Sequence, residues 1–146
     1  MKEDRVRDFV VTWLSKNDYT DIKLTASRGA PRKRREGRGR PRLNPTDPDV
    51  KARKGSAYYF IEVKGDPPLT WKIYQAVGEI CTKRASTTPK ICAIAFPRSF
   101  ARILSKTLPL RAWEKLKIRI LIVDNSGNVS EFPPSKRSFE KIQGLL

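Results

Sequence analysis

Asp49, Glu62 and Lys64 are the residues of this chain whose types and spacing are best suited to chemistry. Side chains alternate along a strand, so Glu62 and Lys64 project from one face of the apolar segment that ends with them. If that segment pairs in a hairpin with the residues after Asp49, the two carboxylates approach each other. Close carboxylates repel unless a cation neutralises them, and their oxygens suit Mg²⁺ or Mn²⁺. Such a cation could activate a water against a phosphate, while Lys64 positions that water or neutralises phosphate oxygens.

The Glu-x-Lys triplet is a weak signal when it is taken alone. Asp21-x-Lys23 and Asp49-x-Lys51 have the same spacing, and the alternative interpretation is a solvated strand face with an opposite-charge pair. Three features favour a site: an apolar run immediately before Glu62, a Pro-Asp pair one hairpin upstream, and a predicted helix immediately afterwards. Asp47 shares strand parity with Asp49, but Asp49 adjoins the strand and fits the spacing better.

The absence of histidine restricts the chemistry further. It excludes zinc-finger ligand sets that contain histidine, the usual serine and cysteine triads, and histidine-based nucleases. Cys81 and Cys92 lie in apolar surroundings, where we expect buried free thiols rather than a disulfide. Hydrolytic chemistry in this chain must therefore use carboxylates, lysine and a hard cation.

The charge of the chain points to a polyanionic partner. Its 146 residues fit one domain, and 31 Lys and Arg face 15 Asp and Glu, which leaves a formal charge of +16. So many positive charges repel one another in a compact fold, and such an excess is tolerated chiefly when the protein binds a polyanion. Nucleic acid is favoured over a membrane because we find neither a basic amphipathic helix nor a lipidation motif. Without an apolar signal core or a membrane-spanning run, we expect a cytoplasmic, nucleoid-associated protein.

A basic segment interrupts the regular pattern at about residues 27–47. Residues 28–42 contain eight cations, three glycines, two prolines and one acidic residue, Glu36. The segment cannot bury apolar area, so we expect a flexible loop that contacts nucleic-acid phosphates. The alternative is a charge run that is merely solvated or serves localisation. The cations expected to contact phosphate are Arg28, Arg32, Lys33, Arg34, Arg35, Arg38, Arg40 and Arg42.

The remaining sequence predicts an α/β fold with one central mixed sheet flanked by helices. An apolar stripe with helical spacing indicates a first helix, and two continuous apolar runs are typical of strands covered on both faces. The predicted order is α, β, β, β, α, β, α, β, α. Its elements are a helix at 3–16, strands at 19–25, from 50 and at 57–64, a helix at 70–86, a strand at 90–96, a helix from 100 that Pro109 interrupts, a strand at 118–123 and a helix after Ser135.

Pro48-Asp49, the 13-residue step to Glu62, and Glu62-Val63-Lys64 resemble the motif of the PD-(D/E)xK nuclease superfamily. Within that superfamily, the chain is most similar to archaeal Holliday-junction resolvases, over about residues 1 to 96. Its basic insertion is long, and the part after residue 97 does not resemble a resolvase. The resemblance therefore indicates a nuclease class more strongly than four-way-junction specificity.

The resemblance also assigns supporting residues. Glu3 matches an acidic position on the first helix, Gln75 matches a glutamine that often follows the core lysine, and Ser27 belongs to a DNA-contacting segment. Read from the residues alone, Glu3 could instead interact with the helix dipole, and Gln75 could form a surface pair with Glu79. One face of the same helix is expected to be core; it carries Trp71, Tyr74, Gly78 and Cys81.

The resemblance implies a restriction-endonuclease-like core in a single nuclease domain over residues 1–146. Asp49 and Glu62 would bind Mg²⁺ or Mn²⁺ with the Val63 carbonyl, and Lys64 would assist the water. The expected activity is a metal-dependent endodeoxyribonuclease of DNA recombination or repair, acting on branched or duplex DNA. Members of the family are often dimers, so a homodimer is a further expectation.

Two other functions remain open from the sequence. The first is a non-catalytic nucleic-acid-binding protein, such as a degenerate nuclease or a ribosome-associated factor, which needs the charge but not neighbouring carboxylates. The second, less favoured, is an interaction module for anionic membranes. Metal-dependent cleavage separates the nuclease from both, and vesicle binding stronger than DNA binding would indicate the membrane module.

Overall fold

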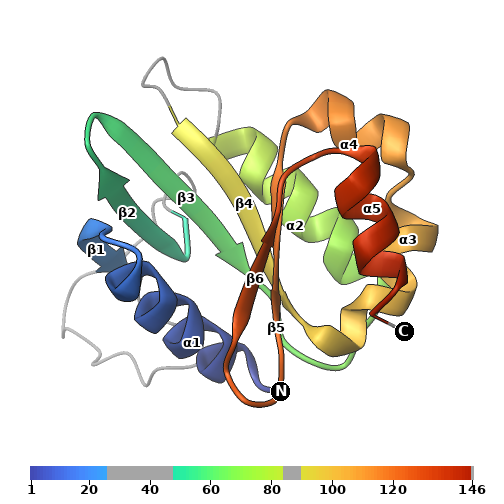
Figure 1. The fold of residues 1–146 in the computed structure, drawn as a ribbon, viewed down its shortest axis with the longest axis horizontal. Helices are drawn as coiled ribbons and strands as arrows, with labels where there is room; N and C mark the ends of the chain where they lie inside the picture. Colours follow the sequence, from blue (N-terminus) through green and yellow to red (C-terminus); the bar gives the residue numbers. More distant parts are fainter. Residues whose placement is uncertain (26–47, 84–89, 146) are drawn as a thin grey trace, which may run out of the picture.

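The centre of the fold is a mixed sheet, which has six strands in the residues that the structure describes (Figure 1). The computed structural model describes residues 1–25, 48–83 and 90–145. The strands lie side by side in sequence order; β3–β4 and β4–β5 are parallel, and the other neighbours are antiparallel. They are β1 (Thr20–Leu24), β2 (Val50–Lys54), β3 (Ala57–Val63), β4 (Lys90–Pro97), β5 (Arg119–Val123) and β6 (Val129–Phe132).

Helices cover both faces of the sheet. The first helix, α1 (Glu3–Lys16), packs on one face through Val6, Val10 and Leu14. The opposite face is covered by α2 (Thr70–Lys83), the short η1 (Arg98–Phe100), α3 (Ala101–Thr107), α4 (Leu110–Leu116) and α5 (Lys136–Gln143). Within the described ranges, no helix has both the length and the apolar character needed to cross a membrane.

Strand β3 divides its side chains between the two apolar cores. Ile61 packs with α1, whereas Phe60 packs with the core beneath α2. Because side chains alternate along a strand, Glu62 and Lys64 follow Phe60 onto the α2 face. The alternation of side chains along β3 therefore places Glu62 and Lys64 beneath α2.

The predicted α/β class with a central mixed sheet flanked by helices is confirmed. The restriction-endonuclease-like core stays a prediction. The helix at 3–16 and the strands that form β1 to β5 lie within one or two residues of their expected bounds. Three elements were not predicted: the short η1; β6, which has four residues of which two are polar; and α4, which starts directly after Pro109 because proline fits the beginning of a helix.

A hydrogen-bonded network joins strands that are distant in sequence, on the α1 face of the sheet. The Tyr59 hydroxyl donates to Glu131 Oε2 at 2.6 Å, and Arg119 binds Glu131 Oε1 at 2.6 Å. Burial and the hydrogen bond to Glu131 raise the pKa of Tyr59 well above its ordinary value of 10. Tyr59 thus ties β3 to β6 as a neutral phenol.

We expect Tyr59→Phe to lower the free energy of unfolding by about 1–2 kcal/mol at neutral pH, because it removes a hydrogen bond to a carboxylate. The raised pKa means that the contribution of the phenol is complete below about pH 10 and is lost as the pH rises above that value. Urea unfolding at about pH 7 and about pH 10.5 should therefore show a steeper alkaline loss for the wild type than for the variant. Tyr58→Phe is the matched control on the same strand, and an equal alkaline loss in wild type and Tyr59→Phe would contradict the assignment.

Candidate active site

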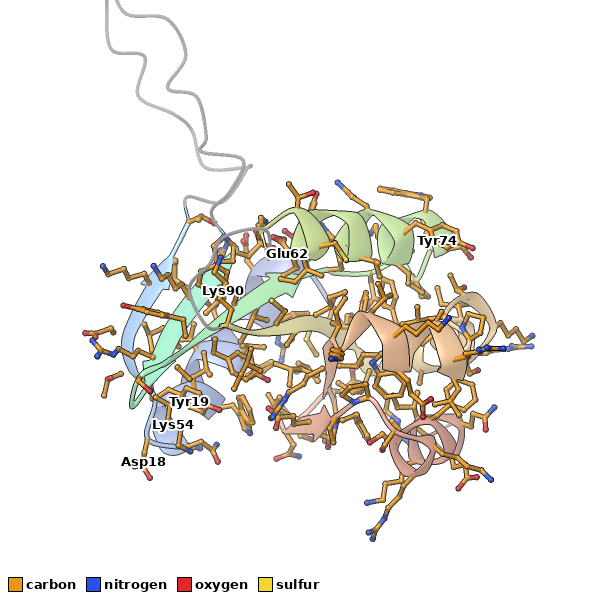
Figure 2. The ribbon with its side chains drawn as sticks, turned by 90° about the horizontal axis from the view of Figure 1, so that it is seen from above. Asp18, Tyr19, Lys54, Glu62, Tyr74 and Lys90 are labelled. Atoms are coloured by element: carbon orange, nitrogen blue, oxygen red, sulfur yellow. The ribbon has the colours of Figure 1, made fainter. Side chains whose placement is uncertain are left out.

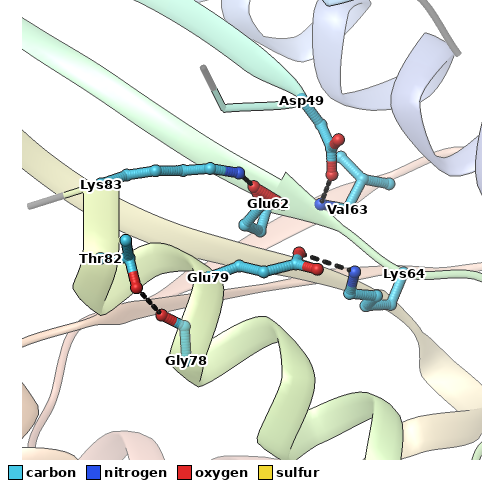
Figure 3. Close-up of polar contacts among 8 residues, drawn as sticks. All are labelled: Asp49, Glu62, Val63, Lys64, Gly78, Glu79, Thr82 and Lys83. Carbon is cyan, nitrogen blue, oxygen red and sulfur yellow. Dashed lines mark hydrogen bonds and ion pairs between the residues drawn. The ribbon is translucent and has the colours of Figure 1, made fainter. Parts of the chain in front are cut away.

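The β2–β3 hairpin brings Asp49 to the end of β3. Val50 pairs with Ile61 in the antiparallel register, so the next step sets Asp49 opposite Glu62. Asp49 Oδ2 accepts a hydrogen bond from the backbone N–H of Val63 at 2.8 Å (Figure 3). The turn at residues 54–57 and the alternation of two short strands are sufficient to bring two carboxylates, 13 positions apart, to one end of the sheet.

Glu62 is a buried carboxylate with a lysine partner. Its residue is 1% exposed, and its Oε1 forms a close ion pair with the ammonium of Lys83 at the end of α2 (Figure 3). In the described part of the chain, no hydrogen bond of normal geometry reaches that oxygen. A buried carboxylate is costly unless a counter-charge neutralises it, so Lys83 supplies a cation where a metal was expected from the sequence.

Lys64 forms a second ion pair with the same helix. It is 6% exposed, and its Nζ donates to Glu79 Oε2 at 3.0 Å. Its backbone N–H donates to the Ala95 carbonyl at 3.0 Å, which holds the residue beside β4. The lysine is therefore fixed at both its main chain and its side chain, and its ammonium is held under α2 on the same face as Glu62 (Figure 3).

Glu79 and Lys83 were not predicted from the sequence as partners of Glu62 and Lys64. The alternative interpretation of Glu79 from the sequence, a surface pair with Gln75, is wrong because Glu79 binds the buried Lys64. The available signal was the four-residue step from Glu79 to Lys83, which places both on one flank of a helix. The helix follows β3 immediately, so that flank could have been matched to Glu62 and Lys64.

The donor set at the end of β3 fits a hard cation in its chemistry. Asp49 and Glu62 supply carboxylate oxygens, and the Glu62 Oε1 that a cation would bind is held by the Lys83 ammonium. No group of three or more His, Cys, Asp or Glu side chains that could hold a metal occurs among the described residues. The Val63 carbonyl and solvent oxygens would therefore have to complete the shell, which is the usual mode of Mg²⁺.

Comparison with known proteins assigns neither a family nor a function to this chain. Neither protein-family models, nor curated proteins, nor solved structures match this chain. The residues of the site are therefore interpreted from their own geometry.

The start of α1 lies against the segment that follows Lys64. A Cβ added to Gly65 would collide with the backbone N of Glu3 and lie 2.8 Å from its Cα, and the Asp66 N–H donates to the Met1 carbonyl at 2.8 Å. A glycine is needed at position 65 because the two backbones touch there. Glu3, whose side chain is exposed, is thus placed near the site by its main chain.

The structure places Gln75 on α2, half-buried and one turn before Glu79. Its side chain makes no hydrogen bond to the described residues, so its role stays a prediction. The prediction that Trp71, Tyr74, Gly78 and Cys81 form the core face of this helix is wrong. The helix instead buries Ile73, Ala76 and Ile80, and Trp71 and Tyr74 are exposed.

The predicted nucleic-acid-binding segment and the competing Asp47 lie outside the described residues. The predictions for them are neither supported nor contradicted by the structure. The residues concerned are Ser27, Arg28, Arg32, Lys33, Arg34, Arg35, Arg38, Arg40, Arg42 and Asp47.

Proposed function

We propose that this protein is a Mg²⁺-dependent endonuclease of the PD-(D/E)xK type that hydrolyses phosphodiester bonds in DNA. The observation that carries the proposal is the position of Asp49 opposite Glu62 at the end of β3, with Lys64 on the face of Glu62. Oxygen donors of this kind select a hard divalent cation. The absence of histidine from the sequence is compatible with this chemistry.

Each residue of the site would have a distinct task. Asp49 and Glu62 would bind the cation, which when bound lowers the pKa of a coordinated water and stabilises charge on the phosphate. Lys64, with its ammonium already oriented by Glu79, would hold the attacking water or a phosphate oxygen by charge. Glu79 would act as a positioning residue, since it holds the Lys64 ammonium in place.

The excess of positive charge supports nucleic acid as the substrate. A formal charge of +16 favours a polyanion and raises the rate of encounter with it. Each phosphate neutralised on duplex DNA steepens the salt dependence of binding by about 0.9 in log–log slope. Binding is therefore expected to weaken strongly between low and physiological salt.

Non-catalytic binding of nucleic acid is the second candidate function. The observation that favours it is the Lys83 ammonium on Glu62, which already neutralises one of the two carboxylates. A protein of this kind would bind DNA tightly and in a salt-sensitive way, and would cleave none with any divalent metal.

Cleavage of end-labelled four-way junction, flap and linear duplex DNA in Mg²⁺ tests the proposal, with EDTA as the blank. We expect Asp49→Asn to reduce cleavage by at least about tenfold, because the amide keeps the bond to the Val63 N–H but lacks the charge that holds the cation.

The matched control is Asp21→Asn, which changes the aspartate of the exposed Asp21-x-Lys23 triplet. Asp21 has a φ of 51°, a conformation that asparagine also adopts, so this variant should retain wild-type cleavage. DNA binding without cleavage in Mg²⁺ or Mn²⁺ would select the second function instead.

A further inference from the structure

The outer face of α2 exposes two aromatic side chains. Trp71 is 57% exposed and Tyr74 is 63% exposed, although large aromatic side chains usually bury most of their surface. They are three residues apart, so they are neighbours on one side of the helix. Figure 2 shows Tyr74 toward one end of α2 and Glu62 toward the other. Within this chain, the described residues leave both rings facing solvent.

A glycine lies next to this pair, and no contact with the described residues requires its small size. Gly78 is exposed in the middle of α2, four residues after Tyr74, and a Cβ there would meet nothing within 4 Å. Glycine inside a helix costs about 1 kcal/mol relative to alanine. The missing side chain leaves the surface beside Tyr74 flat, which would allow a partner to approach the helix closely.

The surroundings of the aromatic pair are cationic. Lys72 lies 5.9 Å from the Trp71 ring, and the elements packed together on this side, α2, η1 and α3, also carry the exposed Arg98, Arg102 and Lys106. Their one acidic residue is Glu79, which is paired with Lys64. A second copy of a +16 chain would be repelled by this surface, whereas a phosphate backbone would be attracted to it.

We propose that Trp71 and Tyr74 form a stacking platform for unpaired nucleobases, with the adjoining cations on the phosphates. Bases inside a duplex are already stacked on each other, so exposed aromatic rings bind single-stranded segments. With a rise of 1.5 Å per residue, Tyr74 and Trp71 lie about 8 Å and about 12 Å along α2 from Glu79. These distances run along the helix axis, and an unpaired stretch of a few nucleotides is long enough to reach from the candidate active site around α2 onto the rings. The inference deepens the proposed function, because it makes the substrate a DNA with single-stranded nucleotides beside the cleaved bond.

The test measures binding of the full chain to a fluorescein-labelled dT₁₂ oligonucleotide in EDTA and constant salt, so that no cleavage is needed. We expect Trp71→Ala and Tyr74→Ala each to raise the Kd by about 5- to 150-fold, and Trp71→Phe to retain binding within about threefold because it keeps a ring. Leu69→Ala is the matched control, since it removes an exposed apolar side chain that cannot stack. Trp113 is buried and Trp13 packs on the α1 face, so quenching of tryptophan fluorescence by dT₁₂ should disappear in Trp71→Phe.

Further measurements distinguish a stacking platform from other uses of this surface. Gly78→Gln places a side chain beside the rings and is expected to raise the Kd for dT₁₂, while thermal unfolding shows that the variant is folded. An unchanged Kd in Trp71→Ala/Tyr74→Ala would overturn the platform, as would a dimer that this double variant dissociates, or tighter binding to anionic vesicles than to dT₁₂. If Trp71-dependent binding is found but no cleavage occurs with any metal, the nuclease function fails and the platform stands.

Discussion

Glu62→Gln is expected to reduce metal-dependent DNA cleavage by about 100- to 1000-fold. The substitution keeps the shape of a side chain that is 1% exposed but removes the charge that would hold the cation beside Asp49. A catalytic divalent cation contributes several kcal/mol to the stabilisation of the transition state, and each 1.4 kcal/mol corresponds to about a tenfold change in rate. Single-turnover cleavage of the substrate that wild type cuts best, at saturating protein, measures this effect separately from DNA binding.

The control for Glu62→Gln is the same substitution at a glutamate that lies far from the site. Glu114 is exposed on α4, so Glu114→Gln makes the same chemical change and should leave the cleavage rate unaltered. DNA binding in EDTA should be no weaker in Glu62→Gln than in the wild type, because the substitution removes a negative charge that would repel a polyanion. Undiminished cleavage by Glu62→Gln would show that the activity comes from a contaminant or from another part of the chain.

The parts of the fold that follow from local periodicity could be read from the sequence. The stripe at Val6, Val10 and Leu14 predicts α1 because these residues recur on one helical face, and all three are buried. The alternation in β3 likewise predicts that Glu62 and Lys64 share a face. These features depend only on residues that are close together in the chain, so a single sequence contains enough information.

The parts that depend on contacts between distant segments could not be read in this way. Trp71, Tyr74 and Gly78 look like a buried stripe because tryptophan and tyrosine are apolar, but the sheet covers the face with Ile73 and Ile80 instead. Hydrophobicity alone does not decide between two apolar faces of one helix. The four-residue step from Glu79 to Lys83 places both on one flank of α2, but the pairing of Lys83 with Glu62, 21 positions earlier, depends on how the helix packs on the sheet.

Two ion pairs determine the arrangement of charges at the candidate site. Lys83–Glu62 and Lys64–Glu79 both connect the end of β3 to α2, and each contains a lysine that is less than a tenth exposed. An ion pair taken out of water returns little net stability, because desolvation offsets its attraction. Both pairs are therefore better explained by the charges they hold in place than by a contribution to folding.

Lys83→Met is expected to lower the free energy of unfolding by about 3–5 kcal/mol, because it removes the ammonium from the buried Glu62 carboxylate. The apolar replacement has a similar length, so packing beside the sheet is largely retained and the loss reports on the charge. Chemical unfolding in EDTA measures it, and Lys136→Met, which removes an exposed lysine 4.0 Å from Glu140, should change the stability little. Combining Lys83→Met with Glu62→Gln is expected to recover most of the loss, because neither charge is then buried alone.

The same variant tests whether the ammonium occupies the place of a divalent cation. If Mg²⁺ binds Glu62, it should raise the Tm of Lys83→Met more than that of the wild type, because the ion replaces the missing counter-charge and does not compete with a lysine. The double variant Lys83→Met/Glu62→Gln should lose this response to Mg²⁺. A Lys83→Met protein as stable as the wild type in EDTA would show that the lysine does not neutralise Glu62. A destabilised variant with no Mg²⁺ response would confirm the ion pair but argue against metal binding at this carboxylate.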